Sequence, residues 1–235
     1  MSLYSAIQFT SVTFLYARAS NLGDFQFLFI DLALILPVAI FMGWAGPAPR
    51  LCRKRPTADL VSRKVLTPLL GFMLICIAFQ TVTYITVKEQ SWYIPPVVHK
   101  DEPSIENSQN TALFLFSCFE YILSGVILNA GRPFRQRTTQ NWPFAATIFI
   151  ALLITVYMIL TPAEWVTNLM QLTGMSWDYE LFLIALGAAY FIVAWAFEHF
   201  LALKLARLIG TIQQSVTGKG KKRKEYKVIA ESSRI

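Results

Sequence analysis

Apolar residues in this chain gather into six long runs that are separated by polar segments. Each run approaches the length at which a helix, rising about 1.5 Å per residue, crosses about 30 Å of hydrocarbon. The pattern therefore predicts an all-α fold, a polytopic transmembrane helix bundle with six spans. The expected spans are Leu3–Ala17, Phe25–Trp44, Val65–Val87, Thr111–Asn129, Pro143–Thr161 and Glu180–Leu203. We expect residues 1–210 to form this six-span domain and residues 211–235 to form a basic cytosolic tail.

The first run is the shortest, and a signal peptide is the alternative interpretation of it. Signal peptides normally begin with a basic segment and end at a small-residue cleavage site. No Lys or Arg precedes Arg18. The run is therefore better interpreted as a membrane helix that is cut at its cytoplasmic end.

Charge supports the membrane interpretation and orients the spans. Of the 235 residues, 55% are apolar and 15% are charged, and the mean hydropathy is +0.48. Basic residues are concentrated in the segments after the second, fourth and sixth runs, whereas Arg18, Lys88 and Lys100 are alone in the intervening segments. This alternation is the positive-inside pattern and predicts that both termini are cytosolic. The net charge of +7 is thus mainly a topology signal.

The most basic stretch is in the C-terminal tail, at Gly218–Lys224. Nothing in the sequence pairs it with a folded reading surface, so nucleic-acid binding is not expected. Attraction to anionic cytosolic lipid, at about 1 kcal/mol per basic residue near the surface, is one interpretation. A solvated tail with no ligand is the other.

Residues with catalytic or metal-binding chemistry are few. The cysteines are Cys52, Cys76 and Cys118, and the histidines are His99 and His199. None of them forms a spacing typical of a metal site. The sequence contains no GxxxxGK[ST] loop, no GxGxxG and no Asp-Lys-Thr-Gly-Thr phosphorylation motif. We therefore expect no cofactor, no metal and no catalytic residue in this chain.

Two carboxylates mark the second run. Asp24 lies at its start and Asp31 lies inside it, seven residues further on. A carboxylate inside a membrane helix costs at least about 2.5–3.5 kcal/mol on insertion scales and is usually functional. The spacing is two helical turns, so both acids share a face about 10.5 Å apart along the axis, like a polar track for a cation. The structural alternative is that Asp24 caps the helix and Asp31 pairs with a basic or amide group of a neighbour.

Other polar residues in the runs have weaker signals. Tyr4, Gln8 and Ser11 recur at helical spacing and form one stripe on the first helix. Gln80 resembles the amides that bond between membrane helices. We leave the role of Glu120, in the middle of the fourth run, open. Pro37 should loosen or kink the second helix below Asp31, because proline lacks a backbone donor.

Several motifs resemble one family closely. They are Leu3-Tyr4-Ser5-Ala6-Ile7-Gln8-Phe9, the stretch from Asn21 to Leu32, Gln90-Ser91-Trp92-Tyr93, Asn110-Thr111, Phe119-Glu120-Tyr121, Gly131-Arg132-Pro133-Phe134-Arg135-Gln136 and the Lys221–Lys224 tail. In these motifs the chain resembles the fifth to tenth membrane helices of the type-V P-type ATPases, B branch. That family exports polyamines from lysosomes, late endosomes and fungal vacuoles. Glu120 departs from it, since glutamine is expected at this position.

The resemblance implies a function and a site. The chain would be the C-terminal transmembrane domain of an ATP-driven polyamine or cation transporter in a vacuolar, lysosomal or endosomal membrane. Tyr4 and Gln8 would line the cation path opposite Asp31, with Asp24 at its lumenal mouth. ATP and Mg²⁺ would bind the N-terminal half of the pump, which this sequence lacks. We expect either a truncated sequence or a separately excised C-terminal half.

Two alternatives belong to other functional classes. The chain could be a stand-alone membrane scaffold that docks to a full pump or another partner. It could also be an independent secondary carrier that uses Asp24, Asp31 and Glu120. A carrier of that kind predicts internal symmetry between spans one to three and four to six. The sequence shows none, because the acidic second span has no counterpart in the fifth.

Overall fold

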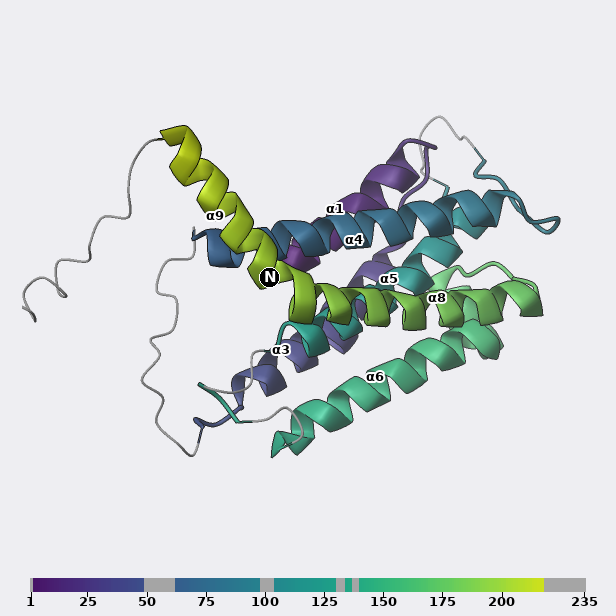
Figure 1. The fold of residues 1–235 in the computed structure, drawn as a ribbon. Helices are drawn as coiled ribbons and strands as arrows, with labels where there is room; N and C mark the ends of the chain where they lie inside the picture. The colour runs from purple at the N-terminus through teal and green to yellow at the C-terminus, as the bar shows by residue number, and fades with distance from the viewer. Residues whose placement is uncertain (1, 49–61, 98–103, 130–133, 137–139, 218–235) are drawn as a thin grey trace, which may run out of the picture.

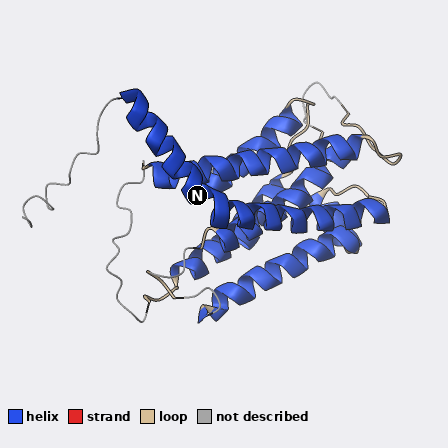
Figure 2. Ribbon diagram, in the orientation of Figure 1, coloured by secondary structure: helices blue, strands red, loops and turns tan. Residues whose placement is uncertain are grey.

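Helices make up all the regular structure of the described residues, which in this computed structural model are 2–48, 62–97, 104–129, 134–136 and 140–217 (Figure 1). Within these ranges no strand forms (Figure 2), and extended pairing is limited to the isolated bridges Ser20–Ser104 and Pro47–Arg135. In chain order the elements are α1 (Ser2–Tyr16), α2 (Asp24–Leu28), η1 (Phe29–Ile35), α3 (Leu36–Gly43), α4 (Arg63–Lys88), α5 (Ser108–Ile127), α6 (Trp142–Leu160), α7 (Glu164–Met170), α8 (Trp177–Ala196), η3 (Phe197–Ala202) and α9 (Leu203–Thr217).

Membrane-length helices account for most of the predicted spans. Five segments are long and apolar enough to cross a bilayer: Asp24–Gly43, Val65–Lys88, Ser108–Ile127, Trp142–Leu160 and Trp177–Ile209. Helix α1 has 15 residues, which is shorter than the usual length of a span. The all-α prediction is therefore confirmed, and five of the six predicted spans are supported. The predicted tail from residue 218 onward lies outside the described residues.

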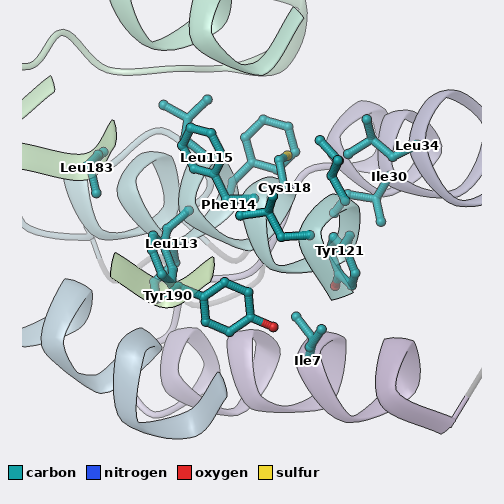
Figure 3. Packing of buried hydrophobic residues seen from close by; sticks show 14 of the residues in the cluster. Ile7, Ile30, Leu34, Leu113, Phe114, Leu115, Cys118, Tyr121, Leu183 and Tyr190 are labelled. Atoms are coloured by element: carbon teal, nitrogen blue, oxygen red, sulfur yellow. The ribbon is translucent and has the colours of Figure 1, made fainter. Parts of the chain in front are cut away.

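Helix α5 is the centre of the bundle. Within its apolar window 83% of the residues are buried, against 22–28% in the other four membrane-length segments. It packs against α1, α4, α6 and α8. Figure 3 shows Leu113, Phe114, Leu115 and Cys118 of this helix among side chains from the surrounding elements. The outer helices consequently present most of their apolar surface outward, as expected where lipid is the solvent.

Close helix contacts depend on two glycines. A Cβ on Gly187 of α8 would lie 3.0 Å from the Phe119 ring of α5. A Cβ on Gly71 of α4 would collide with the ring of Phe197 in η3. Small residues of this kind let membrane helices approach closely.

The second membrane segment is not a regular α-helix. Its middle third, η1, is a π-helix in which the Leu36 N–H donates to the Asp31 carbonyl. Pro37 follows directly, near the start of α3. The sequence predicted a loosened helix below Asp31, but the widened turn contains Asp31 itself. The reason is that the missing N–H and the ring of proline both act on the turn that precedes it.

Backbone hydrogen bonds tie the connecting segments together at two opposite ends. At one end Ser104 N donates to Ala19 O at 3.1 Å. At the other end Ala48 N donates to Phe134 O at 3.2 Å, and Gln136 N donates to Gly46 O at 3.0 Å. The segments that follow α1 and α4 therefore meet at one end, and the segments that follow α3 and α5 meet at the other.

Candidate functional site

Asp31 and Tyr4 meet between the first two helices of the chain. The Tyr4 hydroxyl donates to Asp31 Oδ1 at 2.5 Å. Asp31 itself is exposed, so the carboxylate has room to contact a ligand as well as the phenol. The sequence-based alternative, in which Asp31 pairs with a basic or amide group, is not what the structure shows.

Gln8 completes this cluster from one turn along α1. Its side chain faces the Tyr4 hydroxyl. Tyr4 also packs on Tyr121 of α5, with ring centroids 5.6 Å apart. The phenol that holds Asp31 is therefore fixed from two sides, by an amide and by an aromatic ring.

Asp24 lies apart from the cluster. It is exposed and is the first residue of α2, where its charge favourably meets the positive end of the helix dipole. It is not the cap, because Gly23 occupies that position. The start of α2 is instead held by the buried Gln26, which accepts from Gly23 N at 3.1 Å and donates to Met170 O at 2.8 Å. Gln26 was not predicted as a site residue, because its only signal in the sequence is a polar side chain two positions after an Asp.

A pocket of about 210 Å³ opens beside the Tyr4–Asp31 pair. Its walls come from α1, η1, α3 and α5, and most are apolar. They are Leu3, Tyr4, Ile7, Ile35, Val38, Ala39, Met42, Tyr121, Ser124, Gly125 and Leu128. Asp31 is not one of these residues, and it is joined to the pocket through Tyr4. An apolar space of this kind suits a methylene chain, and it does not suit a bare metal ion.

A second pocket, of about 570 Å³, lies at the end of the bundle that holds the Ala17–Ala19 turn. Arg18 and Lys88 are among its lining residues. Arg18 Nε donates to Tyr84 Oη at 3.4 Å, and this bond raises the pKa of the guanidinium above its ordinary value. With two positive charges in its wall, this pocket repels cations.

A buried polar network, Ser11–Gln80–Glu120, joins α1, α4 and α5. Gln80 Nε2 donates to Glu120 Oε2 at 2.6 Å, and Ser11 Oγ donates to Gln80 Oε1 at 3.1 Å. The interhelical role predicted for Gln80 is thus confirmed. That these three residues meet could not be predicted, because they lie in different apolar runs. In the described part of the chain, no three His, Cys, Asp or Glu residues come close enough together to hold a metal ion.

Comparison with known proteins gives one family. The family described as "cation transporting ATPase, C-terminus" matches residues 20–200. The vacuolar cation-transporting ATPase YPK9 of Saccharomyces cerevisiae is 43% identical over 185 residues, which cover 78% of this chain and 12% of that protein. Polyamine-transporting ATPase 13A3 of Homo sapiens is 33% identical over 214 residues, covering 81% of this chain and 18% of the relative. Polyamine-transporting ATPase 13A2 of Mus musculus is 35% identical over 201 residues, which cover 84% of this chain and 17% of that relative.

Proposed function

Because the chain belongs to the family of cation-transporting ATPase C-terminal regions, within the type-V P-type ATPases, we propose that it is the transmembrane domain of a polyamine or cation pump. Two of the relatives are named for polyamine transport and one for cation transport at the vacuole. The chain spans less than a fifth of the length of these relatives. In this proposal the catalytic domains, with ATP and Mg²⁺, belong to the N-terminal half, which is the main partner of this domain.

The observation that carries the proposal is the hydrogen bond from Tyr4 to the exposed Asp31 carboxylate. An ammonium group is held by a carboxylate and by the face of an aromatic ring, and this pair offers both. The neighbouring apolar pocket of about 210 Å³ suits the methylene stem between two ammonium groups. A polyamine combines these features, so Asp31, Tyr4 and Gln8 would form its site and Asp24 would attract it.

The proposal includes a topology. Helix α1 would be the first of six spans, since it packs along α4 and α5 and buries Leu3, Ile7, Ser11 and Leu15 on one face. The two termini and the basic ends of the helices would face the cytosol, in a vacuolar, lysosomal or endosomal membrane. Helix α9, with its exposed Leu205, Leu208 and Ile212, would lie in the inner interface, where the basic tail could contact anionic lipid.

Asp31→Asn in a complete pump that carries this C-terminal half tests the proposal. The amide keeps the size of the side chain but removes the charge that compensates an ammonium group. A charge-assisted bond contributes about 1.5–3 kcal/mol, so polyamine-stimulated ATPase activity should fall at least roughly tenfold. Asp178→Asn is a matched control, because Asp178 is also exposed but lies at the start of α8.

Melting temperature should be measured on the same variants. A structural role for Asp31 would lower the melting temperature and leave the polyamine dependence intact. Normal polyamine stimulation of the Asp31→Asn pump would show that Asp31 is not a cargo ligand.

A further inference from the structure

Glu120 is a carboxyl group in the most buried part of the bundle. It lies on α5, and its side chain is 0% exposed. An ionised carboxylate in such surroundings is strongly disfavoured unless charges or several hydrogen bonds compensate it. The contacts of Glu120 therefore decide its protonation state.

Those contacts are few and all neutral. Glu120 Oε2 accepts from Gln80 Nε2 at 2.6 Å. The other oxygen, Oε1, has no hydrogen-bond partner among the described residues. Gln80 is oriented by the rest of the network, since its Oε1 accepts from Ser11 and its Nε2 also lies 3.4 Å from the Ile7 carbonyl. One amide donor compensates a carboxylate poorly, but it suits the carbonyl oxygen of a carboxylic acid.

Among the described residues, no positive charge faces Glu120 from the surrounding elements. The ionisable groups that interact with it are Cys76 of α4, Tyr190 of α8 and Tyr121 of α5, all uncharged at neutral pH. Tyr4 of α1 and Asp31 of η1 lie beyond Tyr121. Helix α3 has no ionisable side chain. The ionisable side chain of α6 is Tyr157, which is exposed. The buried residues in the described part of the chain include no Lys, Arg or His.

We propose that Glu120 is a proton-binding site of this membrane domain, enclosed by Gln80 and Ser11 and separate from the Tyr4–Asp31 pair. A proton from water joins the carboxylate to give a neutral acid, with Oε2 as the carbonyl that accepts from Gln80 and Oε1 as the hydroxyl. The site does not depend on which cargo Asp31 binds.

The same helix connects the two sites. Tyr4, which holds Asp31, and Ser11, which holds Gln80, both lie on α1. A displacement of α1 from its neighbours would break both bonds together and open Glu120 to proton exchange. This coupling, unlike the proton site itself, rests on the proposed function.

Infrared difference spectroscopy of the full chain in lipid nanodiscs at neutral pH tests the site. The C=O stretch of a protonated carboxyl group should be lost in Glu120→Gln and kept in Glu89→Gln, a matched control at an exposed position after α4. Loss of a carboxylate band in Glu120→Gln, with the acid region unchanged, would overturn the proposal.

A second variant keeps the test valid if Glu120→Gln does not fold. Gln80→Leu removes the donor to Oε2, so the acid C=O stretch should shift to higher frequency. No shift would contradict the geometry.

The probes KCl and NaCl, compared with choline chloride, separate a proton site from a metal-ion site. We expect the acid band to be the same in all three salts. Conversion of the band to a carboxylate band by K⁺ or Na⁺ would overturn the proposal in favour of a metal-cation site.

Discussion

Asp31 and Glu120 are both carboxyl groups within membrane-length helices, but their surroundings differ in kind. Asp31 is exposed and accepts from a phenol, so its carboxylate can exchange hydrogen-bond partners. Glu120 is enclosed and has a single amide donor, so it cannot reach an organic cation without a rearrangement of α1 or α4. At the scale of single residues, this difference in burial supports the proposed cargo role for Asp31 and the proposed proton role for Glu120.

Tyr4→Phe tests the support of Asp31 in a complete pump. The substitution keeps the aromatic ring against Tyr121 and removes only the hydroxyl that donates to Asp31. A neutral hydrogen bond contributes about 0.5–1.5 kcal/mol, so the loss of polyamine-stimulated activity should be smaller than in Asp31→Asn. Gln8→Ala should give a similar intermediate loss. Steady-state ATPase titrations with spermine would measure both, and a loss in Tyr4→Phe as large as that in Asp31→Asn would contradict this order.

Asp24→Asn should change apparent affinity more than maximal rate. Asp24 is exposed at the start of α2, where water and salt screen its charge. The role that we propose for it is therefore to attract the cation and not to hold it. An exposed ion pair contributes about 0.2–1 kcal/mol, so the apparent affinity for polyamine should fall by about 1.4-fold to fivefold. The difference between wild type and variant should shrink as ionic strength rises. A fall in maximal rate at unchanged affinity would place Asp24 in a later step of the cycle.

At the scale of elements, the irregular second helix and the central α5 determine where the polar groups lie. The π-helical turn of η1 contains Asp31, and a π-turn rotates side chains away from the positions of a regular helix. Helix α5 carries Glu120 and Tyr121 as neighbours, one in the buried network and the other in the wall of the pocket. The central position of α5 depends on close contacts with its neighbouring helices, such as the contact of Phe119 with Gly187 of α8.

Gly187→Leu tests the closest approach of α5 and α8. A side chain at Gly187 would press on Phe119, which is only 5% exposed and has little room to move. Overpacking of this kind costs about 1–3 kcal/mol, so the melting temperature in detergent should fall. Gly43→Leu is the matched control, because nothing lies within 4 Å of a Cβ at Gly43. Equal melting temperatures for the two variants would show that the α5–α8 contact adapts.

At the scale of the whole molecule, apolar run length predicted the helices well, because every long run must satisfy its backbone in lipid. It did not predict that α5 is central, since Glu120 and the other polar residues of that run make it the least apolar of the five membrane-length segments. The Tyr4–Asp31 contact was expected only from the family resemblance, as the two residues are 27 positions apart. The Ser11–Gln80–Glu120 network could not be predicted, because interhelical contacts leave no period in the sequence.

Topology is the property of the whole chain that a single experiment can test. The hydrogen bonds from Ala48 to Phe134 and from Gln136 to Gly46 place residues 46–48 and 134–136 at one end, and the bond of Ser104 to Ala19 places these two residues at the other. We predict that Gly46–Ser62 and Gly131–Asn141 lie on the cytosolic side and Lys88–Asn110 on the lumenal side. The positive-inside rule assigns the first end to the cytosol. In sealed isolated vacuoles, whose cytosolic face is outward, Arg135→Cys should react with a membrane-impermeant maleimide. Ser91→Cys should react only after permeabilisation, and the wild-type chain gives the background of the native cysteines. Labelling of Ser91→Cys in sealed vacuoles, with Arg135→Cys protected, would invert the orientation and place Asp24 at the cytosolic mouth.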